Sequence, residues 1–250
     1  MNFEDAASRI HRLYRPLNIL ALETSSAWCS VALWLDGRTI EREELAGQRH
    51  SELLVPMVDE VLAQAALDLS ALHAIAFGAG PGSFTGLRIA CGVAQGLAAG
   101  TGLNVVGVST LAAIAQASSA QRVLACLDAR MGQIYCAAYE RDGEAWSEIQ
   151  PPQLCTAASA PDLADGEWVG AGSGFAVHGP ALARRYDGRI ARVLPDLHPR
   201  AREIALIAVK LVERGMAVAP DQAHPMYLRD HVALTVEERR ARNQAATEQS

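Results

Sequence analysis

The chain has 250 residues, of which 50% are hydrophobic and 20% charged, a composition typical of a folded globular protein. Its formal net charge of −6 disfavours a nucleic-acid-binding surface made by this chain alone, because contact with phosphates normally requires a basic patch. No run of about 18 apolar residues is present, so we expect no membrane span.

The two ends of the chain differ in composition from the rest. Residues 1–17 form a charged extension that lacks the apolar core of a signal peptide. Residues 237–250 are charged and then rich in Gln, Ala and Thr, and we expect a disordered tail there. The 5 cysteines are widely spaced without a C-x-x-C motif. This usage is typical of reduced thiols in the cytosol, so a cytoplasmic protein is expected.

Residues 18–108 are predicted to form a first α/β lobe. It begins with a buried strand, an alternating strand and a more polar strand, at Asn18–Glu23, Ser26–Leu35 and Arg38–Leu45. Asp36-Gly37 reads as a two-residue hairpin turn between the second and third strands. A helix over Ser51–Leu67 follows, with apolar residues at helical spacing and Pro56 near its first turns.

A glycine-rich loop then joins a short strand at Ile75–Phe77 to a second helix, which starts at Ser83 to Thr85 and runs to Ala99. Backbone N–H groups at such a loop can hold an anion at the helix start. Alternatively, the loop is a tight turn that needs glycine for its dihedral angles. The residue types leave both interpretations open for the loop residues Gly78, Gly80, Pro81, Gly82, Ser83, Thr85 and Gly86.

The second helix is apolar on all sides, which is typical of a helix covered on every side. Gly92, Gly96 and Gly100 recur every four residues and alternate with small Ala residues. An interior glycine costs roughly 1 kcal/mol relative to alanine, so the pattern indicates that another backbone packs closely there. Because a sheet covers only one face of a helix, the other face is predicted to bind a second protein.

The second half of the chain, residues 109–236, repeats the first and is predicted to form a second lobe. Gln121–Asp128 is a buried strand ending in an acid, as Asn18–Glu23 is, and Asp142-Gly143 is a second hairpin turn. The acids Glu23 and Asp128 lie 105 positions apart, and the two hairpin turns 106. This internal repeat predicts two related lobes, each a mixed sheet with helices.

No complete catalytic motif is present. The glycine loop lacks the lysine of a Walker A motif, and no two histidines have the i, i+4 spacing of metal ligands on one helix face. Glu23, Asp128 and Gly172 are the best candidates for a nucleotide cleft between the lobes. The alternative, favoured for the two acids, is that they brace the loops that follow them. We therefore expect no catalytic residues and no metal site.

Five longer motifs read NILALETSSAWCSVALWLDG, GAGPGSFTGLRIACGVAQGLA, GVSTL, LDARMGQIYCAAYE and PMYLR. Together they resemble the bacterial TsaB (YeaZ) family of tRNA threonylcarbamoyladenosine biosynthesis proteins. The resemblance implies the two-lobed fold of actin, sugar kinases and the heat-shock ATPases. It also implies a cytoplasmic, non-catalytic subunit that binds and activates the catalytic paralogue TsaD, acts with the TsaE ATPase and meets tRNA only through the complex. The chain departs from the family in its N-terminal extension and at Glu23, where relatives often have Asp.

In that family the two first-lobe helices pack against their counterparts in the partner. The corresponding interface candidates here are Leu53, Leu54, Met57, Val61, Arg88, Ala90, Val93, Ala94 and Leu97. A charged residue at Ala94 is expected to abolish the complex while leaving the fold intact. The resemblance implies no cofactor for this chain, with ATP or ADP bound only in the complex, and a homodimer through the same helices when the partner is absent. The alternatives are a free-standing ATP-dependent kinase or carbamoyl-type transferase using Glu23 and Asp128, and a metalloprotease.

Overall fold

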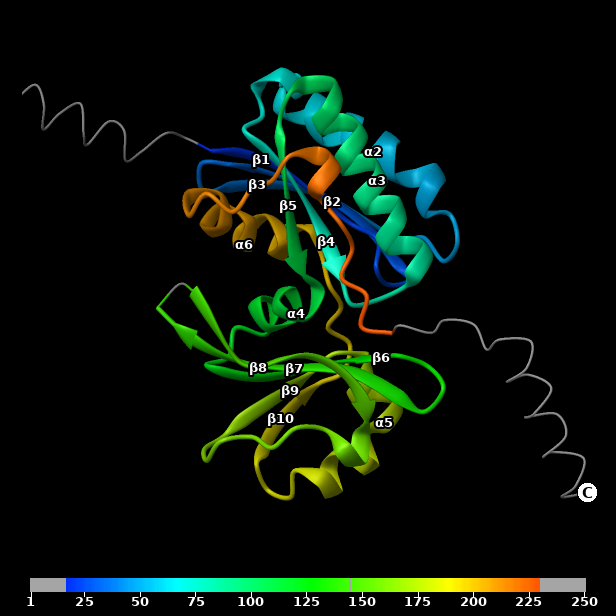
Figure 1. Cartoon of the computed structure of the whole chain (residues 1–250), viewed down its shortest axis with the longest axis vertical. Helices are drawn as coiled ribbons and strands as arrows, with labels where there is room; N and C mark the ends of the chain where they lie inside the picture. The colour runs from blue at the N-terminus through cyan, green and yellow to red at the C-terminus, as the bar shows by residue number, and fades with distance from the viewer. Residues whose placement is uncertain (1–16, 144, 230–250) are drawn as a thin grey trace, which may run out of the picture.

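The computed structural model describes residues 17–143 and 145–229, which form two stacked α/β lobes (Figure 1). Residues 1–16 of the predicted extension and the predicted 237–250 tail lie outside the described residues. Each lobe is built on one five-stranded sheet. None of the helices in the described ranges combines the length and apolar character needed to span a bilayer.

The first sheet has the strand order β3-β2-β1-β4-β5. Strand β1 pairs antiparallel with β2 and parallel with β4, and β5 extends the parallel side. The predicted turn joins β2 to β3, and both Asp36 (φ 41°) and Gly37 (φ 93°) have the positive φ of a type I′ hairpin. The strands are β1 (Asn18–Glu23), β2 (Trp28–Leu35), β3 (Arg38–Leu45), β4 (Ala74–Gly80) and β5 (Asn104–Ser109).

The second sheet repeats this pattern, with the order β10-β9-β6-β7-β8. Strand β6 pairs antiparallel with β7 and parallel with β9, as β1 does with β2 and β4. The strands are β6 (Arg122–Asp128), β7 (Gln133–Asp142), β8 (Ala145–Thr156), β9 (Trp168–Ala171) and β10 (Ile190–Leu194). The internal repeat and the two-lobed α/β fold with a mixed sheet in each lobe are therefore confirmed.

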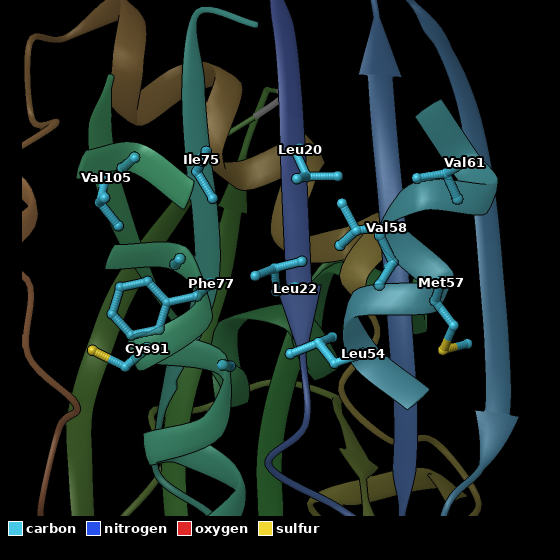
Figure 2. Packing of buried hydrophobic residues seen from close by; sticks show 14 of the residues in the cluster. Leu20, Leu22, Leu54, Met57, Val58, Val61, Ile75, Phe77, Cys91 and Val105 are labelled. Carbon is cyan, nitrogen blue, oxygen red and sulfur yellow. The ribbon is translucent and has the colours of Figure 1, made fainter. Parts of the chain in front are cut away.

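Helices α2 (His50–Ala65) and α3 (Phe84–Thr101) cover the face of the first sheet that is turned away from the second lobe (Figure 1). The core beneath them is formed by alternate residues of the strands and the inner sides of both helices. Figure 2 shows this core, in which Leu54 and Val58 of α2 lie against Leu20 and Leu22 of β1. Because successive side chains of a strand point to opposite faces of the sheet, every second side chain of β1 packs against these helices.

The opposite face of the first sheet is covered by α6 (Ala201–Glu213), whose Ile204, Ala205 and Ala208 pack against Ile19 and Ala21 of β1. Helix α4 (Thr110–Ser118) lies between the lobes, and α5 (Ser173–Arg185) packs on the second sheet. Short 3-10 turns occupy Leu69–Ala71, Ala157–Ser159 and Pro220–Gln222.

The placement of α6 corrects the predicted lobe boundary. The sequence predicts a second lobe over residues 109–236, but α6 packs on the first sheet, and Val218 forms a bridge with Val105 of β5. The chain therefore returns to the first lobe after β10. A helix with one strongly apolar stripe is stable wherever a complementary sheet face exists, and its sequence position alone does not identify that face.

Candidate functional site

The glycine-rich loop between β4 and α3 wraps closely around the turn that follows β1. A Cβ atom on Gly78 would overlap the Glu23 carboxylate, and one on Gly86 would overlap the Thr24 carbonyl oxygen. A Cβ on Gly82 would lie 2.7 Å from the carbonyl oxygen of Ser25. The loop therefore needs glycine because two backbone segments approach closely, which supports the tight-turn interpretation over the anion site.

Hydrogen bonds hold this turn and the start of α3 together. The Ser83 hydroxyl caps α3 by accepting from the Gly86 N–H at 3.3 Å, as predicted for Ser83 or Thr85. The Thr24 hydroxyl donates to the Gly86 carbonyl at 2.7 Å, and the Ser83 N–H donates to the Ser25 carbonyl at 2.8 Å. The first turn of α3 is thus fixed to the end of β1.

Glu23 and Asp128 occupy equivalent positions and make the same local contact. An oxygen of Glu23 accepts from the Ser25 N–H at 2.5 Å, and an oxygen of Asp128 accepts from the Arg130 N–H at 3.1 Å. In both lobes the acid at the end of the leading strand binds the backbone two residues further on. This confirms the interpretation of these acids as braces for the loops that follow them.

Glu23 is fully buried beneath the glycine loop. Desolvation raises the pKa of its carboxyl to about 7, opposed by hydrogen bonds from Ser25 and Thr24 that favour the charged form. Its second oxygen is buried and has no hydrogen-bond partner among the described residues. Because the glycine loop encloses this carboxyl, Glu23 has no surface to offer to a nucleotide–metal complex, which corrects its candidacy as a cleft residue.

Asp128 is partly accessible and has charged neighbours. One carboxylate oxygen lies 3.3 Å from Nε2 of His178, and the other lies 3.3 Å from the Arg130 guanidinium. The His178 contact was not predictable from the sequence, because the two residues are 50 positions apart and His178 has non-helical backbone angles within α5. Gly172 has φ 100° and lies against the Cys126 carbonyl, so it shapes the turn before α5. Within residues 17–143 and 145–229, no group of three His, Cys, Asp or Glu side chains is arranged to hold a metal ion.

The outward side of α3 carries the glycines singled out in the sequence. Gly92, Gly96 and Gly100 are exposed, and a Cβ atom on any of them would meet nothing within 4 Å in the described chain beyond the backbone of α3 itself. Arg88 continues the same four-residue spacing and is also exposed, and Val93 and Leu97 flank the stripe half-buried. We call this surface, formed by Arg88, Gly92, Val93, Gly96, Leu97 and Gly100, the α3 outer face.

More than half of the predicted interface residues are buried in the first lobe, so their prediction as partner contacts is wrong. Leu54, Met57, Val61, Ala90 and Ala94 lie within the first-lobe core, each at most 6% exposed, so they present no surface to a partner. Figure 2 shows Leu54, Met57 and Val61 in this core. Leu53, Arg88, Val93 and Leu97 remain accessible. The corrected residues are apolar at helical spacing because they face their own sheet. The expectation that a charge at Ala94 would leave the fold intact conflicts with this burial.

An aromatic cluster borders the N-terminal end of the α3 outer face. The Arg88 guanidinium lies 3.5 Å from the centroid of the Phe84 ring, and its Nε donates to the Tyr227 hydroxyl at 2.9 Å. Tyr227 belongs to a C-terminal segment, residues 216–229, that runs beside α3 toward the second lobe (Figure 1). The segment ends at Arg229, which donates to the Ala129 carbonyl of the second lobe at 2.9 Å. Sequence reasoning singled out Arg88 but not Phe84 or Tyr227, since nothing in their spacing links them.

Comparison with known proteins gives consistent results. The family model "TsaD: tRNA N6-adenosine threonylcarbamoyltransferase" matches residues 41–235. The chain is 40% identical to the tRNA threonylcarbamoyladenosine biosynthesis protein TsaB of Escherichia coli over 227 residues, which is 87% of this chain and 96% of that protein. It is 35% identical to the TsaB of Haemophilus influenzae over 229 residues, which is 86% of this chain and 95% of that protein.

A solved structure agrees with these sequence matches. YeaZ from Pseudomonas aeruginosa superposes with a TM-score of 0.79 at 37% identity, covering 85% of this chain and 100% of that chain. The sequence and structural matches cover similar shares of the chain, 87% and 85%, and the family model spans parts of both lobes. The chain therefore belongs to the TsaB (YeaZ) family of tRNA threonylcarbamoyladenosine biosynthesis proteins, relatives of the TsaD transferases.

Proposed function

We propose that this chain is a non-catalytic accessory subunit in the synthesis of threonylcarbamoyladenosine in tRNA. In this proposal it acts in the cytoplasm, binds the catalytic TsaD subunit through the α3 outer face, and works together with the TsaE ATPase. ATP or ADP and tRNA are engaged by the assembled complex rather than by this chain alone.

The observation that carries the proposal is the uncovered glycine stripe of α3. Each glycine inside a helix costs about 1 kcal/mol relative to alanine, and nothing in the described chain uses the space that Gly92 and Gly96 leave open. We infer that a partner helix packs against these glycines, because the missing side chains allow two helix backbones to come close. Val93 and Leu97 supply apolar area beside the stripe.

The enclosure of Glu23 supports a non-catalytic role over the alternative of a free-standing kinase or carbamoyl-type transferase. That alternative requires the Glu23 and Asp128 carboxylates to face a shared ligand. Glu23 is instead enclosed by the glycine loop, and one oxygen of each acid accepts a hydrogen bond from its own backbone turn. In the absence of TsaD, we propose that two copies of this chain pair through the same α3 outer face, since an apolar surface of this kind is stabilised by coverage.

Reconstitution with purified TsaD and TsaE tests the proposal. We expect no threonylcarbamoyladenosine in tRNA when this chain is incubated alone with substrates, and full activity when all three proteins are combined. Omitting this chain should abolish or strongly reduce the activity of the other two. Mass spectrometry of nucleosides from the digested tRNA measures the product.

The variant Gly96→Glu connects the activity to the α3 outer face. It should fail to restore activity, whereas Ala183→Glu, which places the same charge on an exposed small residue of α5 in the other lobe, should restore it fully. Product formation by this chain alone, or full activity of Gly96→Glu, would contradict the proposal.

A further inference from the structure

A cavity of about 540 Å³ lies between the two lobes, apart from both the α3 outer face and the two braced turns. It is lined by residues of β5, α4, β7, β8 and α6, together with Trp34 of β2 and Arg214, which follows α6. Trp34 pairs with Ile19, the second residue of β1, and Tyr139 of β7 pairs with Val123, the second residue of β6. The cavity therefore lies near the starts of β1 and β6, whereas the two carboxylates lie at the ends of these strands.

Three aromatic rings line the cavity, and two of them are held in place without a ligand. Tyr139 and Trp146 pack edge to face, with centroids 6.5 Å apart and an interplanar angle of 80°. The Trp146 indole N–H donates to the Gln116 side chain at 2.6 Å, and the Tyr139 hydroxyl lies 3.2 Å from the Ser109 hydroxyl. The third ring, Trp34, comes from the first sheet. These contacts indicate a preformed pocket, as ligand sites generally are.

The charged side chains that line the cavity are positive in sum, whereas the whole protein is negative. Arg141, Lys210 and Arg214 contribute three cations, against one acid, Glu148, although the chain carries a net charge of −6. Lys210 lies 3.7 Å from Glu213 on its own helix, so its charge is partly balanced. Partial burial disfavours the charged form of Glu148 and so raises the pKa of its carboxyl. The lining thus favours an anion over a cation.

We propose that this cavity binds a small molecule made of a planar ring and one carboxylate or phosphate group. The ring packs against Trp34, Tyr139 and Trp146, and the anionic group is neutralised by Arg141 and Arg214. The volume lies within the range of about 300–1,000 Å³ that is typical of small-molecule sites. Because its walls come from both lobes, a bound molecule stabilises their relative position.

Two matched pairs of probes test the proposal by isothermal titration calorimetry on the full chain. Adenosine 5′-monophosphate is compared with adenosine, and indole-3-acetate with indole-3-acetamide. We expect 1:1 binding of at least one anion, about tenfold or more tighter than its neutral analogue, as is typical of a charge-assisted contact. The two pairs distinguish a phosphate ligand from a carboxylate ligand.

Two variants locate the site. Ala112→Trp adds bulk to the cavity lining and should abolish binding, and Arg214→Gln should weaken the anion about tenfold while sparing the neutral analogue. Arg184→Gln, which removes an exposed arginine from α5, is the matched control and should bind as the unmodified chain does. Circular dichroism verifies that each variant is folded. If Ala112→Trp does not fold, the effect of Arg214→Gln on anion affinity decides whether the ligand binds in this cavity.

Three results would overturn the proposal. One is the failure of both anions to bind, and another is equal affinity of the anion and its neutral analogue, which indicates an apolar pocket only. The third is anion binding that Arg214→Gln leaves unchanged, which places the ligand elsewhere on the protein.

Discussion

Two neighbouring positions on α3 should respond in opposite directions to the same substitution. Ala94 is 0% exposed, whereas Gly96 is exposed, and a Cβ atom there meets nothing within 4 Å in residues 17–143 and 145–229 apart from its own helix backbone. Introducing glutamate at each position therefore compares a buried site with an open site on one helix. The sequence spacing places the two residues on two different smooth faces of α3, without saying which face meets the sheet.

The magnitudes follow from burial and helix propensity. Ala94→Glu puts a carboxylate into a core of apolar side chains without a cationic partner, which typically costs about 3–5 kcal/mol. Gly96→Glu replaces a glycine inside a helix with a better helix former, and should stabilise the isolated chain by about 0.5–0.8 kcal/mol. Gly96→Ala, which adds no charge, should stabilise it by about 1 kcal/mol.

Urea denaturation followed by circular dichroism measures these free energies of unfolding. The protein is kept dilute so that self-association does not contribute. The reasoning would be refuted if Ala94→Glu were as stable as the unmodified chain. It would equally be refuted if Gly96→Glu and Gly96→Ala both destabilised the isolated chain by more than about 1 kcal/mol, because that result requires the glycine stripe to be covered within the monomer.

Three further predictions concern the braced turn and the start of α3. The raised pKa of Glu23, about 7 in the folded state, means that its contribution to stability is fully present below about pH 4.5 and is lost as the pH rises through 7. Glu23→Gln should therefore reduce the change in unfolding free energy between pH 5 and pH 8 by up to about 3 kcal/mol, as measured by urea denaturation. A pH profile equal to that of the unmodified chain would contradict the raised pKa of Glu23. Gly86→Ala should lose about 3 kcal/mol or more because its Cβ would overlap the Thr24 carbonyl, and a stability equal to that of the unmodified chain in thermal unfolding would exclude this close packing. Ser83→Ala removes the α3 cap and should cost about 1 kcal/mol in the same assay, with Ser83→Asp as the control that retains capping.

Much of the fold was predictable because local signals and the internal repeat agree. Asp-Gly at 36–37 specifies a two-residue turn, preceded by a strand that alternates and followed by a more polar strand. The same arrangement recurs about 105 positions later, so the topology of one lobe predicted the topology of the other. The N-cap at Ser83 was likewise visible as a polar residue before an apolar helical pattern.

The failures came from contacts between segments that are distant in the sequence. The apolar stripe of α6 shows that the helix is buried on one side, but not that it packs on Ile19 and Ala21 of the other lobe. On α3, the alanines and the glycines predict two smooth faces, and Ala94 is a predicted interface residue, yet Ala94 faces the sheet and Gly96 faces outward. Periodicity predicts that faces exist without saying which one meets the sheet.

Glu23 illustrates the same limit at the candidate site. Its position at the end of a strand predicted either a ligand or a brace, and these alternatives differ only in whether the carboxyl is accessible. Its accessibility depends on Gly78, which lies 55 positions away and leaves room for the carboxylate. The cavity near Trp34 and Tyr139 was not predictable either, because its walls come from both halves of the chain.

The most direct test of the proposed accessory role is the affinity of the purified full chain for TsaD, measured by isothermal titration calorimetry for the unmodified protein, Gly96→Glu and Ala183→Glu. Docking through the α3 outer face predicts that Gly96→Glu loses binding by about a hundredfold or more while remaining at least as stable as the unmodified chain, and that Ala183→Glu binds normally. Equal affinity of all three proteins for TsaD would contradict docking at this face, and no binding by the unmodified chain would contradict the accessory role itself.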